Sequence, residues 1–117
     1  MFAITPEMQH WSAMLEDEVQ RWPGVVARRL FSFRSLYRGK MIFAALPRAR
    51  SFHSPTSFIL KFDPMPPKLL KHASSDSRLD TNTRLPGRGW FSFELSCDSD
   101  LRDALFWLQR AYDCAGR

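Results

Sequence analysis

Several residue types that mark common protein classes are scarce in this chain. Its 117 residues include only two cysteines, too few for the disulfide framework of a small secreted domain or for a cysteine-based zinc site. Its five glycines are scattered, and Gly87-Arg88-Gly89 precedes an expected strand instead of a helix, so no phosphate-binding glycine loop is expected. The longest apolar run, Met41 to Leu46, is far shorter than the ~20 residues that span a bilayer. No membrane association is therefore expected.

The N-terminus has no basic region followed by an apolar stretch, so no secretory signal peptide is expected and the cytoplasm is the default location. Cys97 and Cys114 flank one expected helix, about 24 Å apart at ~1.5 Å per residue. Bridged Cα atoms lie within about 7 Å of each other, so we expect free thiols.

Acidic residues are missing from the forty-four positions between Val19 and Phe62. The same stretch carries nine basic side chains: Arg21, Arg28, Arg29, Arg34, Arg38, Lys40, Arg48, Arg50 and Lys61. The flanks are acidic, because residues 1–18 hold four acids and no lysine or arginine, and residues 89–117 hold five acids against three bases. The formal net charge of +5 is thus an average over one positive region and two acidic ends. Such segregation favours an anionic partner and does not bear on the fold.

The basic stretch has two interpretations. In the first, it binds phosphates and releases their counterions, while interleaved aromatic residues stack unpaired bases. Those aromatic residues are Phe31, Phe33, Tyr37, Phe43 and Phe52. In the second, the charges are solvated, split between the two faces of a sheet, or paired with Glu16, Asp17 and Glu18 of the first helix. The predicted anion-binding residues are Arg28, Arg29, Arg34, Arg38, Lys40, Arg48, Arg50 and His53.

Hydrophobic periodicity predicts one α+β domain over residues 1–117, in the order α-β-β-β-α-β-α, with a four-stranded antiparallel sheet packed against helices. Thr5 and Pro6 suit the start of a helix over residues 6–22, and Pro23-Gly24 suits its end. A second clear helix begins after Asp98 or Ser99, either of which can cap it, and ends near Gly116.

The strands follow from alternation and from turn residues. They are expected at Val25 to Phe33 (with Leu36 to Tyr37 as an extension), Met41 to Leu46, Ser57 to Phe62 and Trp90 to Leu95. A short helix is expected at residues 68–71, and residues 74–88 read as a long polar loop, either functional or mobile.

No catalytic or metal-binding constellation is expected, and no cofactor. Ser51, His53 and Ser54 lie close in sequence but have no local carboxylate to orient the histidine. A loop that recognises phosphate or carboxylate through Arg48, Arg50 and His53 is a better interpretation, beside that of a plain surface loop. The three histidines show no ligand pair at helical spacing.

Three aromatic residues are candidates for contact with a partner. Trp90 belongs to a strand face with Ser92 and Glu94, and it either packs at the sheet edge or contacts a ligand or second subunit. Phe106 and Trp107 lie off the main apolar stripe of the last helix, so they either cover a second edge of the core or form a dimer contact.

Several segments together resemble a known family. They are Trp22-Pro23-Gly24-Val25, Tyr37-Arg38-Gly39-Lys40, Ile59-Leu60-Lys61-Phe62, Gly89-Trp90-Phe91-Ser92-Phe93, and a closing helix with Ala104-Leu105 and Ala111-Tyr112-Asp113. In this order they resemble the "luciferase domain" family of small uncharacterised proteins. More distantly, they resemble MmcQ/YjbR-like domains and the N-terminal domain of TfoX-type competence regulators. The resemblance implies an α+β fold and a nucleic-acid partner, but no light-producing chemistry and no catalytic residues.

The main prediction is a non-enzymatic binding module that contacts an anionic partner, with nucleic acid as the first candidate, through the acid-free region 19–62. The alternative is a protein-interaction module, as a homodimer or with an acidic protein, that uses the sheet face and the last helix. A third class is a small-ligand binder with a pocket between Trp90 and residues 74–88.

Overall fold

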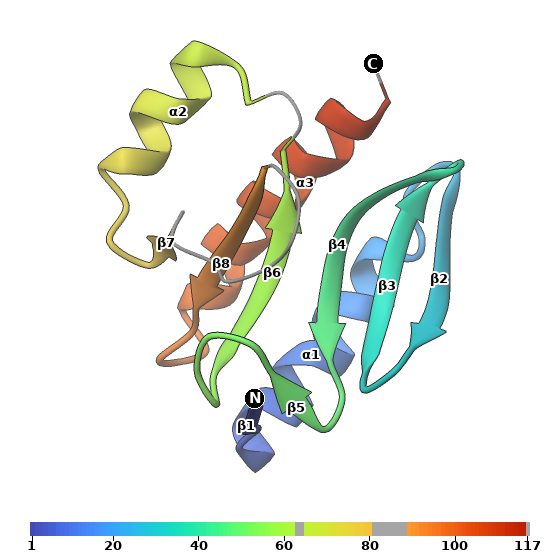
Figure 1. Cartoon of the computed structure of the whole chain (residues 1–117), viewed down its shortest axis with the longest axis vertical. Helices are drawn as coiled ribbons and strands as arrows, with labels where there is room; N and C mark the ends of the chain where they lie inside the picture. The colour runs from blue at the N-terminus through green and yellow to red at the C-terminus, as the bar shows by residue number, and fades with distance from the viewer. Residues whose placement is uncertain (63–64, 81–88, 117) are drawn as a thin grey trace.

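The protein forms a six-stranded antiparallel sheet with two helices on one face, in a computed structural model that describes residues 1–62, 65–80 and 89–116 (Figure 1). The strands lie in the order β2-β3-β4-β6-β8-β7. Their bounds are β2 Val25–Leu30, β3 Phe33–Arg38, β4 Met41–Pro47, β6 Ser57–Lys61, β7 Leu79–Asp80 and β8 Trp90–Glu94. A separate two-stranded sheet pairs β1 (Phe2–Ala3) with β5 (Arg50–Ser51).

The helices are α1 (Pro6–Val19), α2 (Pro67–Ser74) and α3 (Asp100–Ala115). Figure 1 shows α1 and α3 on the same face of the sheet, with α2 near the β7 edge. The α+β class and the antiparallel pairing are confirmed. The four-stranded sheet is a wrong prediction, because the first expected strand is a hairpin of two strands and β7 extends the far edge.

The unpredicted hairpin turns at Phe31 and Ser32, between β2 and β3. Phe31 has a φ of 55°, in the left-handed region that glycine and asparagine adopt most readily. A two-residue hairpin turn normally announces itself by Asn-Gly or a similar pair, and Phe-Ser carries no such signal. The turn at Gly39, where φ is 60°, does carry it and is found where the sequence predicts it.

Alternation along the strands builds two apolar layers. The main core lies between the sheet and the helices and includes Phe43, Phe58, Leu60 and Phe93, each with no exposed surface. On the opposite face, Phe33, Ala45 and Ile59 form a smaller cluster against which Trp90 packs.

The first helix buries the predicted stripe of Met8, Trp11, Leu15 and Val19. Thr5 caps it, since the hydroxyl of Thr5 accepts a hydrogen bond of 3.1 Å from the backbone N–H of Met8. The helix ends at Val19 instead of continuing to residue 22.

The cap of α3 differs from the prediction. Ser99 occupies the N-cap position without a side-chain bond, and Asp98 instead accepts a 2.7 Å hydrogen bond from the indole N–H of Trp11. The carboxylate of Asp100 takes over the capping role, because it accepts backbone hydrogen bonds from Ser96 at 2.8 Å and Cys97 at 3.3 Å. Asp98 therefore fastens α1 to the start of α3.

Arg78, just before β7, binds three carboxylates and so joins the far edge of the sheet to α3. Its guanidinium donates to Asp76 at 3.0 Å, to Asp100 at 2.9 Å and to Asp103 at 2.8 Å. Burial raises the pKa of Asp76, but hydrogen bonds from Arg78 and from the indole of Trp107 outweigh it and hold the pKa below its ordinary value. Burial likewise raises the pKa of Asp100, and hydrogen bonds from the Ser96 backbone and Arg78 bring that pKa below its ordinary value.

Candidate anion-binding site

Strand register brings two arginines side by side at one end of the sheet. Arg29 of β2 pairs with Arg34 of β3, and Arg34 pairs in turn with Leu46 of β4. Because directly paired residues point to the same face, both arginines lie on the face that carries the helices. A third arginine, Arg48, follows β4 and is placed by its backbone N–H, which donates to the carbonyl of Ser32 at 2.8 Å.

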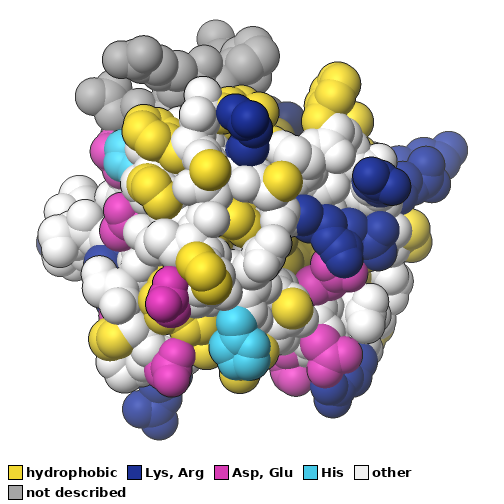
Figure 2. Space-filling model, turned by 90° about the horizontal axis from the view of Figure 1, so that it is seen from below, with side chains coloured by type: hydrophobic (Ala, Val, Ile, Leu, Met, Phe, Trp, Pro, Cys, Tyr) yellow, Lys and Arg dark blue, Asp and Glu magenta, His cyan; other side chains and the backbone are white. Residues whose placement is uncertain are grey.

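These three arginines line one surface hollow of about 630 Å³, which we call the hairpin hollow. Its lining residues are Arg29, Phe31, Ser32, Arg34, Arg48 and Ala49. Figure 2 shows Lys and Arg side chains gathered on the side of the molecule where β2 and β3 lie, next to acidic side chains. The hollow therefore combines residues from the β2–β3 hairpin with the segment that follows β4.

One carboxylate offsets part of this charge. Glu16 of α1 accepts a 3.1 Å hydrogen bond from the Nε of Arg34, and the two side chains are 18% and 26% exposed. Arg29 and Arg48 are exposed and form no ion pair with any side chain in the described part of the chain. The hairpin hollow thus keeps two uncompensated guanidinium groups, each able to fork onto phosphate or carboxylate oxygens.

Two further residues give the hollow a polar floor and an apolar rim. The hydroxyl oxygen of Ser32 is buried and has no hydrogen-bond partner. A buried hydroxyl without a partner is costly, and a ligand oxygen would satisfy it. The side chain of Phe31, by contrast, is 88% exposed.

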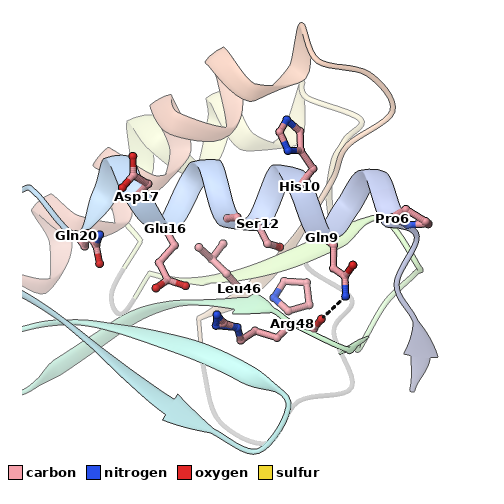
Figure 3. A pocket seen from close by; sticks show the side chains of 11 residues that line it. Pro6, Gln9, His10, Ser12, Glu16, Asp17, Gln20, Leu46 and Arg48 are labelled. Atoms are coloured by element: carbon pink, nitrogen blue, oxygen red, sulfur yellow. Dashed lines mark hydrogen bonds between the residues drawn. The ribbon is translucent and has the colours of Figure 1, made fainter.

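A second hollow, of about 610 Å³, adjoins the first and lies between α1 and the end of β4 (Figure 3). Arg48 lines both hollows, and Figure 3 shows Glu16 and Arg48 pointing into the second from opposite sides. The carbonyl of Arg48 accepts a 3.4 Å hydrogen bond from Gln9. The two carboxylates of Glu16 and Asp17 line this second hollow, which makes it less suited to a phosphate.

The structure does not bring the other predicted basic residues to the hairpin hollow. Arg28 lies on the opposite face of the sheet, with its guanidinium 5.7 Å from the ring centre of Tyr37. Arg38 lies at the C-terminal end of α3, where it donates to the carbonyl of Tyr112 at 3.2 Å and covers the ring of Tyr112 at 4.1 Å. A cation is favourable there because helix C-termini carry partial negative charge. Arg38 is therefore placed to stabilise α3.

The remaining three lie elsewhere. Lys40 is exposed in the β3–β4 turn, and Arg50 is exposed in β5. His53 is 3.5 Å from a carboxylate oxygen of Asp80 in β7. Three of the eight predicted anion-binding residues, Arg29, Arg34 and Arg48, thus converge on one hollow. Ser32 is a lining residue that the sequence does not single out, and its only signal is its place in a hairpin turn.

The three predicted interaction residues have different environments. Trp90 is half-buried, with the ammonium of Lys61 5.6 Å from its ring. Phe106 is 36% exposed on the outer side of α3. Trp107 is 1% exposed and packs against Phe62, so it covers the core and cannot contact a partner. The dimer-contact interpretation of Trp107 is therefore corrected.

The serine-rich loop does not assemble a nucleophile. Ser51 donates to the carbonyl of Ser57 at 2.7 Å, and Ser54 donates to the carboxylate of Glu94 at 2.7 Å. Within residues 1–62, 65–80 and 89–116, no serine hydroxyl forms a hydrogen bond with His53.

Two other functional groups concern the described residues only. Across them, no set of three His, Cys, Asp or Glu side chains is placed to hold a metal ion. No helix among them has the length and apolar content needed to cross a membrane. The predicted loop at residues 74–88 contains the end of α2 and the strand β7, and its part at residues 81–88 lies outside the described residues.

Comparison of the chain with models of known protein families, with curated proteins and with solved structures found no match. The resemblance to the "luciferase domain" family stays a prediction.

Proposed function

We propose that the protein is a non-enzymatic, cytoplasmic binding module that holds a phosphate-bearing partner, nucleic acid first, in the hairpin hollow. The observation that carries this proposal is the convergence of three guanidinium groups on one hollow against a single carboxylate. Arg29, Arg34 and Arg48 come from three separate segments, so their meeting follows from strand register and is not a local accident of sequence.

The chemistry of the hollow suits phosphate better than a diffuse negative surface. Arginine is planar and donates from a fixed fork that matches two phosphate oxygens, which a lysine ammonium does not. The buried hydroxyl of Ser32 supplies a further donor. Because Arg34 is already bonded to Glu16, the exposed Arg29 and Arg48 are proposed to make the first contacts.

The proposal is narrower than the charge pattern of the sequence suggests. Arg28 and Arg38 are engaged with Tyr37 and Tyr112 on other parts of the surface. A footprint of two or three phosphates is therefore proposed. Each phosphate contacted lowers log K by about 0.7 to 0.9 per unit of log salt. Two or three contacts give a slope of about −1.4 to −2.7.

The test is a titration of a fluorescent oligonucleotide at about 50 and about 200 mM salt, followed by polarisation anisotropy. The double variant Arg29→Gln/Arg48→Gln removes two cations from the hollow and is expected to lose affinity and to flatten the salt slope by about one unit per arginine. Arg102→Gln is the matched control, because Arg102 is an exposed arginine on α3. Equal affinities and slopes for all three proteins would refute the proposed site.

A second candidate function is a protein interface on α3. Phe106 is 36% exposed and lies between two shallow hollows, one bordered by Trp22 and Leu105 and the other by Leu69 and Arg110. A homodimer through this surface would appear as a doubled mass in sedimentation, and Phe106→Asp would return it to a monomer. A monomeric wild type at high concentration removes the homodimer.

A further inference from the structure

Phe31 is the most exposed large apolar residue that the structure describes. Its side chain is 88% exposed, against 62% for Met1, which ranks next. It stands at the tip of the β2–β3 hairpin and lines the hairpin hollow. An isolated exposed apolar side chain needs no explanation, but this one borders a cluster of three arginines.

The backbone of Phe31 adds a second observation. Its φ of 55° makes it the one residue other than glycine with a positive φ among residues 1–62, 65–80 and 89–116. A left-handed conformation is costly for an aromatic residue and persists where the surrounding structure holds it. Burial of the ring offsets little of that cost, because most of the ring is in water. Neither packing nor turn propensity explains a phenylalanine here.

The neighbours of the ring indicate what it would contact. Arg29, Arg34 and Arg48 line the same hollow and offer donors to a phosphate. A single nucleotide unit carries a phosphate together with a planar base, which stacks on an aromatic side chain. In a duplex the base faces are already stacked on one another, so the faces of an unpaired base alone are free for Phe31.

The acidic side of the site limits the path of such a strand. Glu16 and Asp17 line the adjoining hollow on α1, where they would repel a second phosphate. A strand is therefore directed away from α1, over the tip of the hairpin, where Phe31 stands.

We infer that the partner is single-stranded nucleic acid, with one phosphate held by Arg29, Arg34 and Arg48 and the adjacent unpaired base stacked on Phe31. This inference rests on the proposed function. The chemistry recognised is an unpaired nucleotide, whose sources are a single strand or a free mononucleotide.

The test compares anisotropy titrations of one labelled oligonucleotide as a single strand and as a duplex, with wild type and Phe31→Ala. The wild type is expected to bind the single strand more tightly than the duplex. Phe31→Ala is expected to weaken single-strand binding about fivefold or more, the lower end of measured base–aromatic stacking, and to leave duplex binding unchanged. Phe31→Trp keeps a stacking surface and should retain affinity. Leu70→Ala, at a 48% exposed apolar residue on α2, is the matched control.

The outcomes separate the two proposals. If Arg29→Gln/Arg48→Gln weakens binding while Phe31→Ala does not, or if the duplex binds as tightly as the single strand, the inference is overturned and the anion site stands. If the arginine variants bind like wild type, the proposed function itself fails. Competition by adenosine monophosphate at the same concentration as an unlabelled single strand distinguishes the sources. Equal displacement by the two competitors would overturn the single-strand partner.

Discussion

Replacing Phe31 by glycine is predicted to make the protein more stable while it removes the proposed stacking surface. A residue other than glycine in the left-handed region costs about 1–2 kcal/mol, which Phe31→Gly releases. Glycine adds freedom to the unfolded chain, which costs about 0.5–1 kcal/mol. The ring is 88% exposed, so its removal forfeits little buried apolar surface. The net expectation is a gain of about 0.5–1 kcal/mol.

For a chain of this size, that gain corresponds to a rise in melting temperature of about 2–5 °C. The assay is thermal unfolding followed by circular dichroism. Lys40→Gly is the matched control, because Lys40 lies in the turn of the neighbouring hairpin, is exposed, and has no positive φ to relieve. Its melting temperature should fall. A fall for Phe31→Gly as well would refute the claim that the backbone is strained at this residue.

Three further predictions concern charges. Arg78→Met should lower the stability by about 2–3 kcal/mol in urea unfolding, since breaking a fully buried ion pair costs about 3–5 kcal/mol and Arg78 is 29% exposed; a loss under about 0.5 kcal/mol would contradict a stabilising role. The folded-state pKa values of Asp76 and Asp100 lie below their ordinary value, so their contribution is present at neutral pH and is lost as pH falls below about 4. The stability gap between wild type and Arg78→Met should therefore narrow in acid, and a gap that widens would be inconsistent with these pairs. Glu16→Gln frees Arg34 and should strengthen oligonucleotide binding about two- to fivefold by anisotropy, whereas weaker binding would argue against Arg34 as a contact.

Much of the fold could be predicted because local patterns and tertiary packing agree. The apolar stripe of α1, the Gly39 turn and the alternation of β8 all depend on neighbours in sequence. The two-residue strands could not be predicted, because β1, β5 and β7 exist only through the partners they pair with. The hairpin turn at Phe31 could not be predicted either, since its residues favour a continuous strand.

The candidate site was predictable in its residue types and not in its membership. The acid-free stretch indicates where the arginines are, but strand alternation sends Arg28 and Arg29 to opposite faces. Arg38 has the same local surroundings in sequence as Arg34, yet it lies over Tyr112 of a helix more than seventy residues away. Register and long-range packing decided which arginines meet.

The most direct test of the central claim is a titration of the isotopically labelled protein with a short single-stranded oligonucleotide, followed by NMR chemical shifts of the backbone amides. The account predicts that the largest shifts cluster at residues 29–34 and 48–49, and that they are lost in Arg29→Gln/Arg48→Gln. Shifts centred on the outer side of α3 around Phe106, or the absence of any shift at low salt, would contradict it.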